Sequence, residues 1–272
     1  MKNKKFSIQF FVKLALLSAI IIILAVTPIG YLPVSIGIKL TIIQVPVIVG
    51  AVLLGPSAGA FLGLVFGLTS FFQAPNDIPL GPAMLSYSVF ATFLICVLPR
   101  VIMGFLSGLL IKAFQHKKIS RFAVNLVPYI ISACISAFII TQFGSGKGSI
   151  FMMMACLIPA VIMGIIVSLI SILTENRFEN TFAFGAVGLL GSLLNTVLFL
   201  GSIYLFLGNI AANALGTTVN GLLVLFMSIA GFNGILEAVA SCIITGAVCK
   251  ALGKINKKQP VLQEAVSEKE EE

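Results

Sequence analysis

Long apolar runs dominate the chain, and short polar or glycine-containing stretches separate them. A helix needs about 20 mostly apolar residues, at about 1.5 Å of rise each, to cross the hydrocarbon core of a bilayer. Measured against that length, the pattern predicts an all-α integral membrane protein with eight apolar segments. They cover residues 8–28, 40–55, 57–74, 87–114, 122–142, 150–173, 182–207 and 229–250.

Two boundaries in this pattern depend on local residues. Gly55-Pro56 marks the break between the second and third segments, because both residues punctuate helices. The region 209–228 opens with asparagine, glycine and threonine residues before it becomes apolar. We expect it to form an outer loop that leads into the last helix.

The composition agrees with a membrane protein and excludes most soluble classes. Apolar residues make up 59% of the chain and charged residues 10%, whereas an average soluble domain carries about 25% charged residues. Too few polar side chains remain to cover a water-facing globule. The net charge of +8 would suggest a nucleic-acid partner in a soluble protein, but here it lies in loops and ends, so we expect none.

Lysine and arginine residues gather on one side of the predicted topology, while the other side holds only Lys39 and Lys147. The positive-inside rule therefore predicts that both termini are cytoplasmic. We expect residues 1–253 to form a single transmembrane domain, followed by a charged, disordered tail at 254–272. The residues on the cytoplasmic side are Lys2, Lys4, Lys5, Lys112, Lys117, Lys118, Arg121, Arg177, Lys250, Lys254, Lys257 and Lys258.

Away from the cytoplasmic ends of the apolar segments, where Lys112 and Lys250 lie, a few charged residues fall inside these segments: Lys13, Arg100 and Glu237. An ionisable group in the bilayer costs at least about 2.5–3.5 kcal/mol and therefore faces a partner or a cavity. Lys13 is near the interface, where a lysine can extend to water. For Arg100 and Glu237, two interpretations stay open: they pair as a structural tie, or they line a polar substrate cavity.

Two amides add to this set. Asn233 lies four residues before Glu237 and so shares its helix face, and Asn195 lies in the middle of the seventh segment, where a free amide in lipid would be unsatisfied. Hydrogen bonding between helices explains any one of these groups alone. Together with Arg100, they predict a small polar pocket.

Small residues form two further patterns. Glycine recurs at every fourth position from Gly55 to Gly67, which places a stripe on one helix face where a second backbone can come close. Ala15 and Ala19 form a similar small face on the first segment. Ordinary helix packing accounts for both patterns on spacing alone.

No motif indicates catalysis or a bound cofactor. The stretch 144–149 looks like a phosphate-binding loop, but that motif needs glycine at 141 and serine or threonine at 148, where this chain has Thr141 and Gly148. The five cysteines are neither in Cys-x-x-Cys pairs nor near a histidine. We therefore expect no metal, no cofactor and no enzymatic activity.

Four stretches, in the same order along the chain, resemble substrate-binding S components of energy-coupling factor (ECF) vitamin transporters. The last of them, Asn233-Gly234-Ile235-Leu236-Glu237-Ala238, is similar to the sixth helix of that family. The others are residues 46–56 continuing through 58–63 (second and third helices), Leu98-Pro99-Arg100 with Gly104 (fourth), and 191–196 with 201–205 (fifth).

The resemblance implies a vitamin-binding membrane subunit that docks on a shared module, made of a membrane-embedded coupling subunit and two cytoplasmic ATPases. The family uses an Ala-x-x-x-Ala face on its first helix for docking, and this maps onto Ala15 and Ala19. The loop between the first two helices, here 28–39, commonly covers the site. The fold implied is a six-helix bundle, in which residues 117–180 would be an inserted two-helix hairpin.

The local pattern looks most like the pantothenate-type branch. In that interpretation Arg100 or Lys39 neutralises a carboxylate, while Asn195, Asn233 and Glu237 bind hydroxyl and amide groups. Riboflavin, cobalamin or another vitamin stays open as the substrate. Two other classes also stay open: a stand-alone secondary transporter in which Glu237 carries a proton and Arg100 stabilises it, and a membrane enzyme such as a lipid-modifying transferase.

Overall fold

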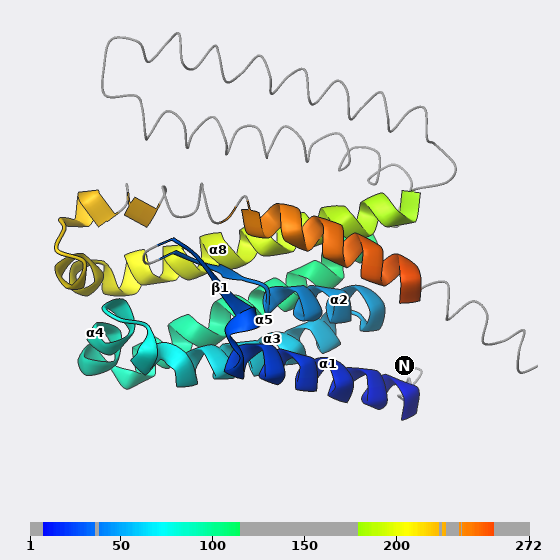
Figure 1. Cartoon of the computed structure of the whole chain (residues 1–272), viewed down its shortest axis with the longest axis horizontal. Helices are drawn as coiled ribbons and strands as arrows, with labels where there is room; N and C mark the ends of the chain where they lie inside the picture. The colour runs from blue at the N-terminus through cyan, green and yellow to red at the C-terminus, as the bar shows by residue number, and fades with distance from the viewer. Residues whose placement is uncertain are drawn as a thin grey trace, which may run out of the picture.

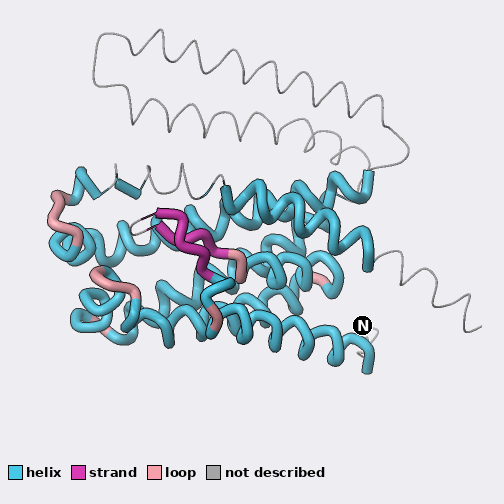
Figure 2. Tube along the Cα trace, viewed as in Figure 1, coloured by secondary structure: helices cyan, strands magenta, loops and turns pink. Residues whose placement is uncertain are grey.

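The computed structural model describes residues 8–35, 38–114, 179–222, 225–226, 234 and 236–252. Within these ranges the chain is helical apart from one two-stranded hairpin (Figures 1 and 2). The all-α class is therefore confirmed. The elements are α1 (Ile8–Val26), η1 (Pro28–Gly30), β1 (Tyr31–Ser35), β2 (Ile38–Thr41), α2 (Gln44–Leu54), α3 (Pro56–Gln73), η2 (Ala74–Asn76), α4 (Leu80–Tyr87), α5 (Val89–Phe114) and α8 (Glu179–Ala214), followed by helical residues at 219–222 and 236–252.

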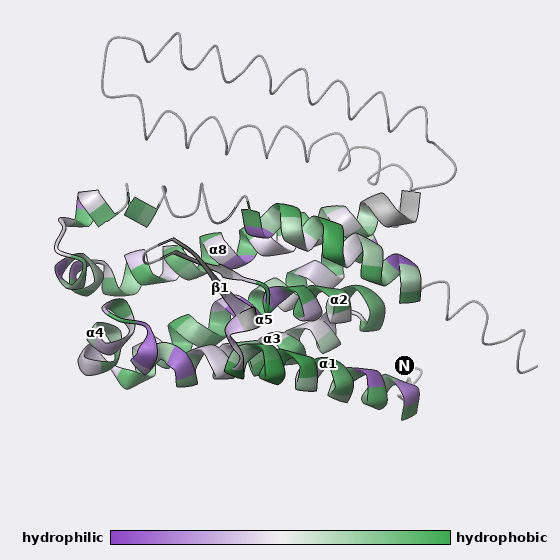
Figure 3. Ribbon diagram, in the orientation of Figure 1, coloured by the Kyte–Doolittle hydropathy of each residue, from purple (hydrophilic) through white to green (hydrophobic). Residues whose placement is uncertain are grey.

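Four helical stretches in the described part of the chain are long and apolar enough to cross a membrane: Ile8–Val26, Pro56–Asn76, Val89–Phe114 and Ala183–Ala214. Hydrophobic residues predominate along these helices (Figure 3). The protein is therefore a multi-pass membrane protein. The predicted segments 122–142 and 150–173, the rest of the predicted insertion 117–180 up to residue 178, and the tail 254–272 lie outside the described residues.

The expected outer loop at 209–228 is wrong in its first part, because α8 continues to Ala214 with a single non-helical residue at Leu207. The helix continues because Ala211 and Ala212 bury their side chains in a cluster with Leu207 and Leu222. The polar residues of this stretch lie on the exposed side of the helix. The turn comes only at Gly216, which has a positive φ of 64°.

The sequence did not predict the hairpin of β1 and β2, whose strands fall in the region interpreted as a covering loop. The strands pair antiparallel, with Tyr31 opposite Thr41 and Pro33 opposite Lys39. They are short, and Pro33 interrupts the alternation that would identify a strand. In Figure 2 the hairpin lies across the middle of the helical bundle, next to the start of α2.

The glycine stripe predicted from the sequence packs α3 against α5. A Cβ atom added to Gly59, Gly63 or Gly67 would meet the backbone of Gly104, Arg100 or Val97, respectively. We call these four glycines (Gly59, Gly63, Gly67 and Gly104) the glycine seam. Gly55, the first residue of the predicted stripe, has open space around it and instead forms the turn between α2 and α3 with a φ of 100°. The seam holds the middle of α5 directly against α3, and Arg100 lies at that point.

The helical residues 236–252 pack against α8 and α2. A Cβ on Gly188 of α8 would overlap the backbone carbonyl of Ser241, and Cys249 packs with Val45 and Val49 of α2. In Figure 1 this stretch lies beside α8. The packing brings Glu237, at the start of the stretch, close to the end of β2.

Candidate functional site

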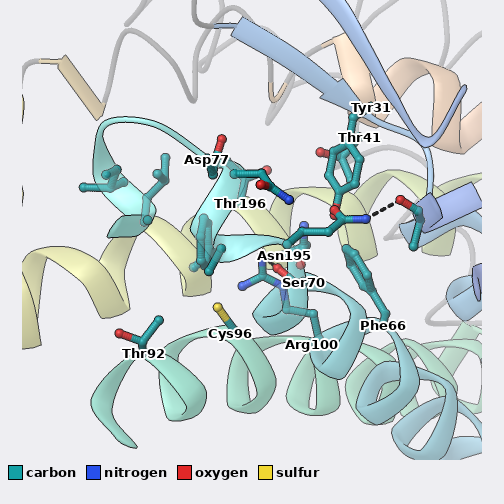
Figure 4. A pocket seen from close by; sticks show the side chains of 18 of the residues that line it. Tyr31, Thr41, Phe66, Ser70, Asp77, Thr92, Cys96, Arg100, Asn195 and Thr196 are labelled. Atoms are coloured by element: carbon teal, nitrogen blue, oxygen red, sulfur yellow. Dashed lines mark hydrogen bonds between the residues drawn. The ribbon is translucent and has the colours of Figure 1, made fainter. Parts of the chain in front are cut away.

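A cavity of about 670 Å³ opens among the hairpin, the helices α3, α4, α5 and α8, and the region around residue 237. Its volume lies in the range of about 300–1,000 Å³ that is usual for small-molecule sites. In Figure 4, Tyr31 and Thr41 lie on the hairpin side of the cavity, while Thr92, Cys96 and Arg100 project from α5 on the opposite side. Both polar and aromatic side chains line it.

Arg100 is 5% exposed and is held by contacts from three sides. Its guanidinium donates hydrogen bonds to the carbonyl of Ile95 (3.2 Å) and to the hydroxyl of Ser70 (3.4 Å). Its Cζ lies 3.8 Å from the ring centroid of Phe199 and 5.5 Å from that of Phe66, distances at which an aromatic face attracts a cation. Its Nε has no hydrogen-bond partner in the part of the chain that the structure describes. A buried guanidinium with unused donor capacity is suited to an anionic ligand.

Glu237 is also 5% exposed but is already engaged by the protein. Its Oε1 accepts a hydrogen bond from the backbone N–H of Thr41 (2.7 Å), and its Oε2 accepts one from the side-chain amide of Gln44 (3.3 Å). The same amide nitrogen of Gln44 donates to the hydroxyl of Ser192 in α8 (2.8 Å). We call Thr41, Gln44, Ser192 and Glu237 the polar junction.

Asn195 reaches the cavity from α8 and is 6% exposed. Among the described residues its buried Oδ1 has no hydrogen-bond partner. An unpaired buried acceptor costs about 1–3 kcal/mol, so this atom is available to a donor that enters the cavity. A hydroxyl or amide N–H of a ligand would complete it.

The structure thus brings Arg100, Asn195 and Glu237 together around one cavity, which agrees with the pocket interpretation of these residues. No ion pair joins Arg100 to Glu237 in the described part of the chain, so the alternative of a structural tie between them lacks support. Lys39 lies in β2. Asn233 lies outside the described residues.

Several polar residues of the cavity wall were not identified from the sequence. Ser70 and Gln73 near the end of α3 were detectable as polar positions in an apolar helix, and Gln73 donates to the carbonyl of Ala25. Tyr31 comes from the hairpin, which the sequence did not reveal. Burial raises the pKa of Tyr31 to about 12, so its phenol keeps its proton at physiological pH. The other polar or thiol-bearing wall residues are Thr27, Asn76, Asp77, Thr92, Cys96 and Thr196.

Ala15 and Ala19 lie on the exposed side of α1. The apolar residues around them, including Phe11 (56% exposed) and Ile23 (59% exposed), are exposed as well. Within the described structure no other helix covers this side, so it faces lipid or another protein.

The chain is similar to a known family of membrane proteins. The family model for the substrate-specific component of ECF transporters matches residues 9–145, which is half of the chain. The pantothenic acid transporter PanT of Lactococcus lactis subsp. cremoris is 27% identical over 217 residues, covering 80% of this chain and 79% of that protein. The near-equal shares mean that the two chains have similar lengths. The pantothenate transporter PanT of Leuconostoc mesenteroides subsp. mesenteroides is 31% identical over 109 residues, covering 40% of this chain and 50% of that protein.

Proposed function

This chain belongs to the family of substrate-specific components of ECF transporters, and we propose that it is the subunit that binds pantothenate for import into the cell. The two relatives carry that substrate in their names. Pantothenate has one carboxylate, one amide and two hydroxyl groups. The proposal assigns its carboxylate to Arg100 and its hydroxyl or amide donors to Asn195.

The observation that carries this proposal is the state of Arg100. The guanidinium is almost fully buried and stacked on Phe199, and within the described residues its hydrogen bonds go to neutral groups, the carbonyl of Ile95 and the hydroxyl of Ser70. Burying an unpaired charge is costly unless a counter-charge is supplied. A carboxylate ligand in the adjoining cavity supplies it, whereas a neutral vitamin would not. Riboflavin and cobalamin, which lack such a carboxylate, therefore fit the site less well.

The second part of the proposal concerns partners. We expect the face of α1 around Ala15 and Ala19 to dock on a membrane-embedded coupling subunit, whose two cytoplasmic ATPases provide the energy. The exposed position of both alanines supports this, because small residues allow close helix approach in a bilayer. The absence of a nucleotide-binding motif from this sequence fits a subunit that leaves ATP hydrolysis to its partners.

The orientation is the third part. With the basic residues of the loops and ends on the inside, both termini are cytoplasmic. The hairpin side of the cavity then faces outward, where the vitamin is collected. Reaction of single cysteines at the N-terminus and in β1 with an impermeant thiol reagent on intact cells would test this orientation. It predicts labelling of the hairpin position and not of the N-terminus.

Uptake of radiolabelled pantothenate, in cells with and without the coupling subunit and ATPases, tests the proposed function. The proposal predicts uptake only with the complete set, and competition by excess unlabelled pantothenate. Uptake driven by a proton gradient without any ATPase would instead indicate a secondary transporter. Competition by a different vitamin, and not by pantothenate, would overturn the substrate assignment.

A pair of substitutions separates docking from binding. Ala15→Leu with Ala19→Leu should abolish uptake and co-purification with the coupling subunit, while pantothenate binding to the isolated protein is unchanged. Ile20→Phe is the matched control, because position 20 lies about 100° or more around the helix from both alanines. Normal co-purification of the leucine pair would show that the docking assignment is wrong.

A further inference from the structure

We propose that Glu237 is a positioning residue that fastens the β1–β2 hairpin over the cavity, rather than a direct ligand of the substrate. Its carboxylate would act through Thr41, the last residue of β2, and through Gln44, the first residue of α2. The inference rests on the proposed function only in the binding experiment, which uses pantothenate as the ligand. The position of the hairpin can be tested without any ligand.

The contacts of Glu237 point to this role. Both carboxylate oxygens accept hydrogen bonds from the segment 41–44, and the bond from the Thr41 N–H is 2.7 Å long. That length is typical of a charge-assisted hydrogen bond, which is roughly twice as strong as one between neutral groups. Gln44 extends the contact to Ser192 of α8. Glu237 and Gln44 together thus join three segments that are far apart in the sequence: residues 41–44, α8 and the helical residues 236–252.

The place of the contact explains how it would affect the site. Thr41 pairs with Tyr31 across the hairpin, and both residues line the cavity. A bond that holds Thr41 therefore holds the two hairpin residues that border the ligand space. Arg100, by contrast, has no hydrogen bond to a carboxylate within the described residues, so the two buried ionisable side chains of the cavity have different tasks.

Hydrogen–deuterium exchange of the full-length protein in detergent, without ligand, tests the inference. We expect Glu237→Ala to raise exchange in peptides covering residues 38–43 by about tenfold or more, the effect of losing a hydrogen bond to a charged group. Exchange in α3 and α5 should not change. Ser241→Ala is the matched control, because Ser241 lies one turn further along the same helix, is also buried and has a hydroxyl without a hydrogen-bond partner among the described residues.

Glu237→Gln keeps the test informative if the alanine variant does not fold. The amide retains an oxygen for the Thr41 N–H, and its nitrogen can donate to Oε1 of Gln44, which has no partner in this structure. We therefore expect exchange at 38–43 within a few-fold of the wild type. An increase in this variant well above tenfold, more than loss of the charge alone accounts for, or wild-type exchange at 38–43 in Glu237→Ala, would overturn the inference.

Binding kinetics distinguish positioning from direct contact. If Glu237 holds the hairpin, Glu237→Ala should raise both the association and the dissociation rate of pantothenate, so that Kd changes less than either rate. A faster dissociation with an unchanged association rate would show that Glu237 contacts the ligand and would refute the positioning role. If the wild type does not bind pantothenate, the proposed substrate is wrong, while the exchange experiment still decides the role of Glu237.

Discussion

The glycine seam and the polar junction hold the same cavity from two sides by different means. At the seam, α3 and α5 approach so closely that added side-chain atoms would overlap the facing backbone. At the junction, Glu237 and Gln44 connect segments through hydrogen bonds between side chains and backbone. Packing at the seam fixes where Arg100 lies, and hydrogen bonds at the junction fix where the hairpin lies.

The comparison shows that close helix packing and unpaired polar atoms lie in different parts of this molecule. Lipid offers no hydrophobic driving force between helices, so close packing of small residues stabilises the seam. The cavity between the two regions keeps unpaired polar atoms on Arg100 and Asn195. Such atoms are costly in a low-dielectric interior unless a ligand pairs with them. Changes at the seam should therefore affect folding, and changes at the cavity wall should affect binding.

The largest effect is expected at the seam. Gly63→Val places branched carbons against the backbone of Arg100, and overpacking of this kind costs about 1–3 kcal/mol or more. We expect a clear loss of folded protein in size-exclusion chromatography and a lower melting temperature. Ala60→Val, a half-buried position on the same helix, is the control. Equal melting temperatures for the two variants would contradict the role of the seam.

Removing the guanidinium of Arg100 from the cavity is expected to affect pantothenate binding without affecting the fold. Arg100→Ala should weaken pantothenate binding by about 100-fold, because hydrogen bonds to charged groups contribute about 1.5–3 kcal/mol each. Calorimetry on the purified protein measures this. Lys112→Ala, in the last turn of the same helix, removes one positive charge away from the cavity and should bind normally. Similar loss in both variants would indicate a general charge effect instead.

Asn195→Leu tests Asn195 through the direction of the change in thermal stability. Since Oδ1 of Asn195 has no partner without ligand, the leucine variant should be as thermally stable as the wild type or more so. Pantothenate binding should fall by about tenfold, the effect of one lost hydrogen bond. A variant that is less stable but binds normally would show that Asn195 serves the fold and not the ligand.

The smallest effect is expected at the ring beneath the guanidinium. Phe199→Leu removes the aromatic face that lies 3.8 Å from Cζ of Arg100, and a contact of this kind contributes about 0.5–2 kcal/mol. Binding should weaken by about three- to tenfold in the same titration. Phe199→Tyr keeps the ring and should stay within about twofold of the wild type. If both variants bind equally, the ring does not orient Arg100.

The sequence was sufficient to predict the glycine contact between helices and several of the polar residues that line the cavity. Glycine at every fourth position identified a close helix contact, and Gly55-Pro56 identified the break between α2 and α3, although the stripe wrongly included Gly55 in that contact. Arg100, Asn195 and Glu237 were detectable because polar groups inside apolar segments are expensive. Their convergence on one cavity required the packing of α8 and residues 236–252, which no local pattern reveals.

The polar junction was not predictable from the sequence, because it too depends on contacts between distant segments. Its central contact joins Glu237 to a backbone N–H at Thr41, nearly 200 positions earlier in the chain. A backbone group carries no sequence signal, and the hairpin strands are short and interrupted by Pro33. The sequence could therefore identify Glu237 as unusual, but it could not separate a residue that holds the hairpin from one that binds substrate.

The most direct measurement of the central claim compares pantothenate with panthenol, its analogue that carries an alcohol in place of the carboxylate, on wild-type protein and on Arg100→Ala. If Arg100 binds the carboxylate, wild-type protein should prefer pantothenate by about 100-fold. The preference should nearly disappear in the variant, since panthenol has no charge for Arg100 to bind. A preference of equal size in both proteins would contradict the account.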